Sequence, residues 1–176
     1  IFVGTDKGKI LTFSLDMVPG AALYSSDNKI VEKIAVDGFE YSLLLRDTNP
    51  VSPVYYVADH NNNLVSLENK AIDFAMTKSR SGELLSIILT EINNLEYEFY
   101  VINEGKIFNR FSITGNNKIN SFSLADTKKD GENYILFANG DQLEAVNLRG
   151  GRADNFPYKE LNGGIFTGTP MAANFS

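Results

Sequence analysis

Short apolar runs rich in aromatic and β-branched residues recur along the chain, and Gly, Asn, Asp and Lys separate them. This pattern predicts strands joined by tight turns, because aromatic and β-branched side chains favour strands and the intervening residues favour turns. Residues 81–92 fit either an amphipathic helix or a buried strand, since a short apolar run satisfies both periodicities. The pattern as a whole predicts an all-β fold.

Four segments share one form, in which an apolar strand, a short polar turn and a second strand follow one another. Each turn contains a residue that tolerates a positive φ angle, as a tight hairpin requires. The segments are 1–15, 54–68, 98–113 and 133–148, with Gly8, Asn62, Gly105 and Gly140 in their turns. A recurring hairpin indicates a repeated structural unit.

A second element recurs ahead of the hairpins: an apolar strand that breaks into a polar corner. Its corner residues are Asp47, Glu91, Asp126 and Asn174. A further strand follows most hairpins, at 21–26, 71–77 and 156–166, whereas 113–118 is too short for one. Four strands in a unit of about 43 residues are typical of a propeller blade.

We therefore predict a β-propeller or propeller-like array of about four four-stranded blades, because stacked blades bury the sheet faces that one blade leaves open. A β-sandwich with regular hairpins is the alternative. The predicted units are 1–40, 41–84, 85–118 and 119–168, with 169–176 as an innermost strand, within a single propeller-like domain over 1–176. Since both ends of the sequence are apolar strand patterns, we interpret the chain as a fragment of a larger propeller. A closed four-unit ring is the other interpretation.

The sequence SLADTKKDGENYILFANGDQLEAVNLRGGRADNFP, continuing to residue 176, resembles the repeats of bacterial FG-GAP and VCBS-like propellers. It has their order of acidic loop, apolar strand, turn, strand and Phe-Pro corner. The segment IFVGTDKGKILTFSL is similar to the strand pair of quinoprotein-like (PQQ-repeat) propellers. The resemblance implies a scaffold. Quinone-cofactor propellers use tryptophans to dock their blades and this chain has none, so we expect no cofactor.

Calcium-binding loops of the FG-GAP kind place several acids along the loop, because Ca²⁺ needs six to eight oxygen ligands. The corresponding loop here has Asp126 and Asp130 as the calcium candidates, with Lys128 between them. A lysine supplies no oxygen. We therefore favour a solvated turn and assign no metal ligand.

Composition excludes several other functions. The 176 residues carry a net charge of −6 without a basic stripe, which argues against a nucleic-acid partner. No apolar run reaches the ~20 residues of a membrane helix, so we expect no membrane insertion. The chain has no cysteine, which excludes thiolate chemistry and Cys-ligated zinc. Its one histidine, His60, lies in a polar turn, where we expect an exposed residue without a catalytic role.

Asp47, Glu91 and Asp126 come from successive predicted units and are the candidate ligand-binding residues, since corners of neighbouring blades converge at one end of a propeller. Alternatively, these acids hydrogen-bond backbone amides and fix their turns. We expect a non-catalytic binding or scaffold domain of a bacterial extracytoplasmic protein, which engages a protein or glycan through its loops. The remaining blades of a parent protein, or a second copy of the chain, are further expected partners. A glycoside-processing enzyme that uses the corner carboxylates is the alternative function.

Overall fold

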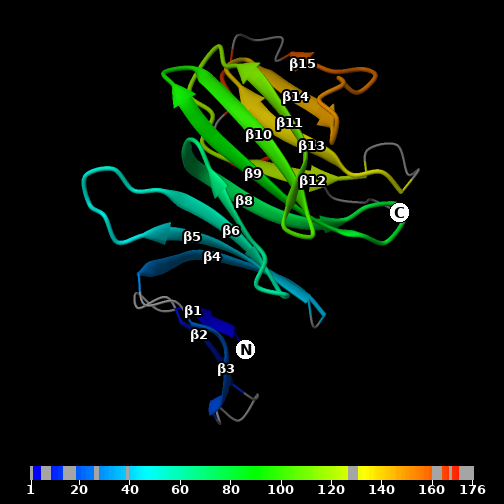
Figure 1. The fold of residues 1–176 in the computed structure, drawn as a ribbon. Coiled ribbons are helices and arrows are strands. Elements are labelled where there is room, and N and C mark those ends of the chain that lie inside the picture. Colours follow the sequence, from blue (N-terminus) through cyan, green and yellow to red (C-terminus); the bar gives the residue numbers. More distant parts are fainter. Residues whose placement is uncertain are drawn as a thin grey trace. The chain divides into compact units, whose positions relative to one another are not determined.

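The computed structural model describes residues 2–4, 9–13, 19–25, 28–38, 40–126, 131–159, 164–166 and 168–170. These residues form fifteen strands and no helix (Figure 1). The all-β prediction is confirmed, and residues 81–92 belong to a strand rather than a helix. The chain divides into two compact units: unit 1 contains residues 1–70 with 104–106, and unit 2 contains 71–103 with 107–176.

Unit 1 holds a three-stranded and a four-stranded antiparallel sheet, each with its strands in chain order. Tyr41, Leu43 and Leu45 alternate along one strand, so they point to the same face and pack with Ile10 and Ala58 in a buried cluster. The first sheet contains β1 (Phe2–Gly4), β2 (Lys9–Phe13) and β3 (Pro19–Ser25). The second contains β4 (Lys29–Asp37), β5 (Glu40–Asp47), β6 (Tyr55–Asp59) and β7 (Leu64–Leu67).

Unit 2 holds two four-stranded antiparallel sheets, again with the strands in chain order. Buried apolar side chains from both sheets pack together in one core between them. One sheet contains β8 (Lys70–Lys78), β9 (Leu84–Asn93), β10 (Glu96–Asn103) and β11 (Lys106–Thr114). The other contains β12 (Phe122–Ala125), β13 (Tyr134–Asn139), β14 (Gln142–Asn147) and β15 (Tyr158–Lys159).

Phe99 of β10 lies at the centre of this core and is fully buried. Its ring centroid lies 5.5 Å from that of Phe111, 5.4 Å from that of Phe122 and 5.8 Å from that of Phe137. Phe111 belongs to the same sheet as Phe99, whereas Phe122 and Phe137 belong to the other sheet. One aromatic side chain therefore joins both layers of unit 2.

Polar contacts join the two sheets of unit 2 strand to strand. The backbone N–H of Phe122 on β12 donates to Asp73 Oδ2 on β8 over 3.0 Å, which ties the two first strands together. Asn109 Nδ2 on β11 donates to the carbonyl oxygen of Leu148, just beyond β14, over 3.0 Å. The two sheets thus stack with their strands in the same order.

The repeat alignment expected from the sequence is wrong by one strand in the last sheet. Segments 54–68 and 98–113 form the third and fourth strands of their sheets, whereas 133–148 forms the second and third. In a meander every two consecutive strands form a hairpin. A hairpin pattern in the sequence therefore does not tell which two strands of the sheet it forms. Asp126 consequently follows a first strand, whereas Asp47 and Glu91 lie on second strands.

The strand at 71–77 is also placed differently from our expectation. It belongs to β8 and is hydrogen-bonded to β9 as the first strand of a new sheet, rather than closing the sheet that contains 54–68. The preceding sheet instead begins with β4, which we did not predict. The four sheets span residues 2–25, 29–67, 70–114 and 122–159, so the predicted units 41–84 and 85–118 do not coincide with them.

Other expectations are confirmed or lie beyond the described residues. Asn62, Gly105 and Gly140 have φ angles of 62°, 69° and 67°, as their hairpin turns require. Gly8, Asp130, Asn174 and most of the segment 169–176 lie outside the residues that the structure describes. A single domain over 1–176 stays a prediction.

Candidate functional site

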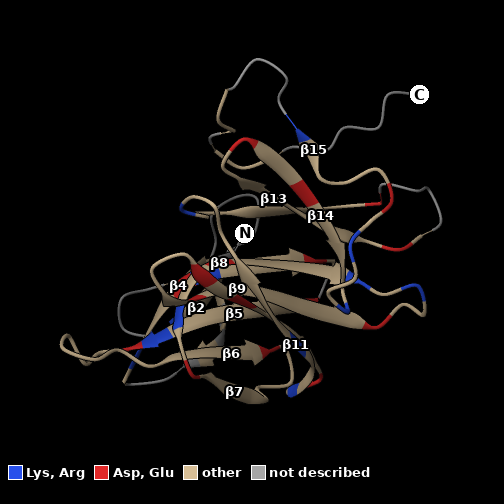
Figure 2. Cartoon of the chain, turned by 90° about the horizontal axis from the view of Figure 1, so that it is seen from above, with Lys and Arg blue, Asp and Glu red and all other residues tan. Residues whose placement is uncertain are grey.

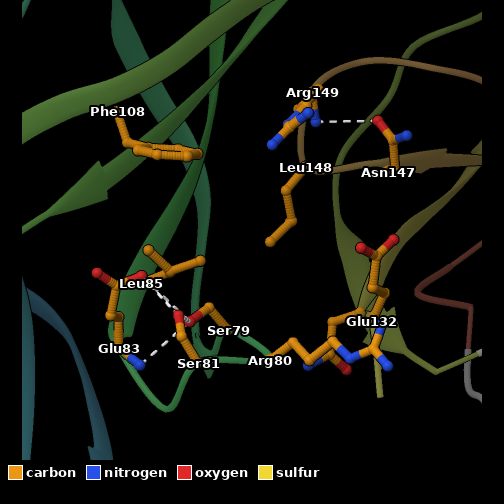
Figure 3. A pocket seen from close by; sticks show the side chains of 11 residues that line it. Ser79, Arg80, Ser81, Glu83, Leu85, Phe108, Glu132, Asn147, Leu148 and Arg149 are labelled. Atoms are coloured by element: carbon orange, nitrogen blue, oxygen red, sulfur yellow. Dashed lines mark hydrogen bonds between the residues drawn. The ribbon is translucent and has the colours of Figure 1, made fainter. Parts of the chain in front are cut away.

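A cleft of about 690 Å³ opens at one end of unit 2, where turns from both sheets meet (Figure 3). Its volume lies within the range of small-ligand sites. Figure 3 shows Phe108 and the β8–β9 turn on one side, with Asn147 and Glu132 on the other. The lining residues are Ser79, Arg80, Ser81, Glu83, Leu85, Phe108, Glu132, Asn133, Asn147, Leu148 and Arg149.

The β8–β9 turn supplies one wall of the cleft and is rigidly built. The Ser79 N–H donates to the Glu83 carbonyl oxygen over 2.8 Å, and the Glu83 N–H returns a bond to Ser79 Oγ over 3.1 Å. Gly82 has a φ of +87°, which a glycine adopts without strain. Ser81 Oγ donates to Glu83 Oε2 over 2.8 Å, so this turn holds the carboxylate of Glu83 in place.

The turn after β14 supplies the opposite wall. Asn147 Oδ1 accepts hydrogen bonds from the backbone N–H groups of Arg149 at 2.9 Å and Gly151 at 2.8 Å. Gly150 has a φ of +85° and packs against Phe111: a Cβ built on it would lie 2.8 Å from Phe111 Cγ. The position therefore needs glycine for both its conformation and its close contact.

The same turn design recurs in unit 1. Asp59 Oδ1 accepts from the N–H groups of Asn61 and Asn63, both at 2.9 Å, and Asn62 carries the positive φ. The turns that begin at Ser79, Asn147 and Asp59 share this design. In each, the side-chain oxygen of the first residue accepts from the N–H four residues later, and the fourth residue has a left-handed backbone conformation. A short oxygen-bearing side chain followed by Gly or Asn three residues on is the sequence signature of this turn.

The apolar part of the cleft is partly open to solvent. Leu85 on β9 is buried, whereas the Phe108 side chain on β11 is 56% exposed at the rim. Leu148 extends into the opening from the opposite side (Figure 3). A large exposed aromatic beside polar groups is a feature of binding sites, because it offers apolar contact area to a ligand.

Two arginines face the cleft from different turns. Arg80 comes from the β8–β9 turn and Arg149 from the turn after β14, and both are exposed. Neither guanidinium makes a hydrogen bond or ion pair with another described residue. The amide nitrogen of Asn147 likewise has no acceptor among the described residues. Across the described chain as a whole, basic and acidic positions are intermixed (Figure 2).

The structure does not place the three predicted acids in equivalent positions. Asp47 Oδ1 accepts from the N–H groups of Asn49 and Val54, both at 3.2 Å, and Asp126 Oδ2 accepts from Gly131 N–H at 2.8 Å. Both carboxylates therefore fix their own turns. Their role in ligand binding stays a prediction.

Glu91 and Asp126 lie toward opposite ends of unit 2. Asp126 bonds Gly131, whose neighbour Glu132 lines the cleft. Glu91 lies on β9 six residues beyond Leu85, which corresponds to about 20 Å along an extended strand. A single binding site that contains both acids is not formed within this unit.

The other chemistry-bearing candidates are placed as follows. Among the described residues no group of three or more His, Asp or Glu side chains is arranged to hold a metal ion. His60 is half-buried rather than exposed: its ring lies edge-on to Tyr41 with centroids 6.5 Å apart, and its Nδ1 is buried. Our expectation of an exposed His60 is therefore wrong, because its ring packs beside Tyr41 of β5.

Two buried glutamates in unit 2 are paired with arginines. Oε1 of Glu98 on β10 lies 2.5 Å from Nε of Arg110, and Oε2 of Glu144 on β14 lies 3.2 Å from Nε of Arg152. Each acid is on the third strand of its sheet and about 5% exposed. Buried charges of this kind need their partners, so we assign these pairs a structural role.

The cleft residues were not among our predicted site residues. The signals that indicate them are the turn sequences SRSGE at 79–83 and NLRGG at 147–151, each with an arginine inside the turn. No feature of the sequence indicates that these two turns, almost seventy residues apart, meet at one opening.

Comparison with known proteins gives no relative: no protein-family model matches the chain, and neither does any curated protein or solved structure. No helix among the described residues is long and apolar enough to cross a membrane.

Proposed function

We propose that the chain is a β-propeller or propeller-like domain that binds a protein or glycan partner without catalysing a reaction. Three consecutive four-stranded meanders, each with its strands in chain order, support the propeller arrangement. The same-order stacking in unit 2 supports it further, because blades of a propeller pack face to face with first strand beside first strand.

The cleft in unit 2 is the proposed binding site. The observation that carries this proposal is the pair of guanidiniums, Arg80 and Arg149, that face one opening from two rigid turns without partners among the described residues. Exposed cationic groups beside an exposed aromatic are suited to recognition, because the turns hold them in place before a ligand arrives.

A binding array of glycans and peptides tests this proposal. We expect residues 1–176 to bind members of the array, and the variants Arg80→Ala and Arg149→Ala to weaken that binding. Lys118→Ala is the matched control, since Lys118 is an exposed cation in the segment between β11 and β12 and does not line the cleft. Binding that is equally sensitive to Lys118→Ala would contradict a specific site.

A second candidate function follows from the carboxylates. Glu83 and Glu132 line the same cleft from different sheets, and glycoside hydrolysis uses two carboxyl groups on either side of the scissile bond. The candidate catalytic carboxylates are then Glu83 and Glu132. The sequence-based hypothesis used Asp47, Glu91 and Asp126 instead. Release of reducing sugar from a bound glycan, abolished in Glu132→Gln, would establish the enzyme and overturn the non-catalytic proposal.

The proposal extends to partners and location. Further blades of a parent protein, or a second copy of the chain, are the proposed structural partners, and the proposed location is extracytoplasmic. Size-exclusion chromatography with light scattering tests self-association: a monomer at micromolar concentration would contradict a second copy as partner.

A further inference from the structure

The cleft contains hydrogen-bond donors that have no acceptor among the described residues. The guanidiniums of Arg80 and Arg149 and the amide nitrogen of Asn147 have no acceptor among the described residues. Glu83, in contrast, already accepts from Ser81 within its turn, and Glu132 is engaged in an interaction within the chain. A ligand that engages these donors brings acceptors, and carboxylates are the best match for a pair of arginines.

The cleft opens onto an unpaired sheet edge. β11 is the last strand of its sheet and, among the described residues, pairs with β10 on one side only. It runs for nine residues without Gly or Pro, and Ile107 and Phe108 on it are 47% and 56% exposed. A long edge strand with exposed apolar side chains has the backbone groups to receive another strand.

We propose that this surface binds an extended acidic peptide, which adds to β11 as a further strand and places carboxylate side chains against Arg80 and Arg149. An apolar residue of the peptide packs on Phe108. The inference rests on the proposed function of the cleft and names its ligand class. β11 and the cleft act together because Phe108 belongs to both.

A peptide explains the observations better than an acidic glycan does. Both would supply carboxylates to the arginines, and both have apolar surface for Phe108. Only a peptide has alternating N–H and C=O groups at the spacing of the β11 edge, so only a peptide uses the sheet edge as well as the cleft.

The probe is a fluorescein-labelled acidic octapeptide of Glu and Ile in alternating pairs, so that each face of the extended chain carries both residue types. Binding to residues 1–176 is measured by fluorescence anisotropy at low salt. We expect saturable binding, a loss of about tenfold in affinity for Arg149→Gln or Arg80→Gln, and no change for Lys118→Gln. Binding should also weaken as salt is raised, since the charges are solvent-exposed. Circular dichroism establishes that each variant is folded.

Two further ligands test strand addition to β11 and carboxylate recognition by the arginines separately. The same octapeptide with an N-methyl group on every residue has no backbone N–H to donate to a strand edge but keeps its carboxylates, and we expect it to lose most of the affinity. Equal binding of the methylated and unmethylated peptides would overturn strand addition. Equal binding of an octapeptide with Gln in place of Glu would overturn recognition by the arginines.

An oligogalacturonate distinguishes failure of this inference from failure of the proposed function. If the oligogalacturonate binds in an Arg149-dependent manner and the peptide does not, the inference is wrong and the cleft remains a binding site. If neither these ligands nor any member of the array binds, the proposed function fails as well.

Discussion

The side-chain amide of Asn109 donates a 3.0 Å hydrogen bond to the backbone carbonyl oxygen of Leu148, 39 residues further along the chain. This contact joins the edge strand β11 of one sheet to the turn after β14 of the next. Because Leu148 and its neighbours on both sides line the cleft, one bond fixes the distance between the sheet edge and the opposite cleft wall. The proposed site therefore depends on how two sheets stack and not only on either turn.

Removal of this hydrogen bond should lower the free energy of unfolding only slightly, and it should weaken peptide binding more clearly. Asn109→Ala leaves a part-buried carbonyl oxygen without its donor, so we expect a loss of about 1 kcal/mol in the free energy of unfolding. Urea denaturation measures that loss, and anisotropy with the acidic octapeptide measures the effect on affinity. Asn120→Ala is the matched control, since Asn120 is exposed and lies outside both the cleft and β11. Unchanged stability and affinity in Asn109→Ala would show that the bond positions nothing.

Gly82 and Gly150 occupy equivalent positions in the two turns that line the cleft, so alanine substitutions at the two positions can be compared directly. Both have φ near +85°, but a Cβ at Gly150 would lie 2.8 Å from Phe111 whereas a Cβ at Gly82 has nothing within 4 Å. Gly82→Ala should therefore show only the left-handed backbone strain of about 1 kcal/mol. Gly150→Ala should cost about 1–3 kcal/mol more, because it also overpacks the core beside Phe111. Equal losses in urea denaturation would contradict the close contact.

The aromatic centre of unit 2 should dominate its stability. Phe99→Ala removes a fully buried ring that contacts three other phenylalanines, and we expect a loss of about 3–5 kcal/mol. Phe108→Ala, on an exposed ring, should change the free energy of unfolding by less than ~1 kcal/mol while it weakens peptide binding. A large stability loss in Phe108→Ala would mean that this side chain supports the fold rather than a ligand.

Unit 1 should lose stability in alkali. Burial raises the pKa of Tyr41 above its ordinary value of 10.0, and the nearby Asp59 and Tyr24 raise it further. A raised pKa means that the folded state favours the neutral phenol, so the contribution to stability is complete below the unfolded pKa and is lost as pH rises through the folded pKa. Urea denaturation from pH 8 to pH 11 should show this decline, with tyrosinate absorbance reporting the titration. A Tyr41→Phe variant with an equally steep decline would contradict the assignment to Tyr41.

The sequence was sufficient to predict the all-β class and several individual turns. Asn62, Gly105 and Gly140 were identified as left-handed positions because only Gly and Asn adopt that conformation readily. The two turns that line the cleft carry equivalent signals at Gly82 and Gly150. The conformation of a tight turn therefore depends on a few neighbouring residues, and it can be predicted without knowledge of the fold.

Strand partners and the site were not predictable in the same way. Whether 71–77 pairs with the strand before it or after it depends on side chains such as Ile72 packing into the unit 2 core, which is a long-range property. The cleft depends on the Asn109–Leu148 contact, and a single sequence carries no sign of that pairing. Asp126 was aligned with Glu91 for the same reason: local likeness does not specify a strand's place in its sheet.

In the proposed function the cleft of unit 2, and not the corner acids, is the binding surface. Amide chemical shifts of ¹⁵N-labelled residues 1–176, recorded during titration with the acidic octapeptide, test it most directly. We predict that the shifted amides cluster at 79–85, along β11 and at 147–151, and that Arg149→Gln needs about tenfold more peptide to reach the same shifts. Shifts that cluster instead around Asp47 or Glu91 would contradict the account.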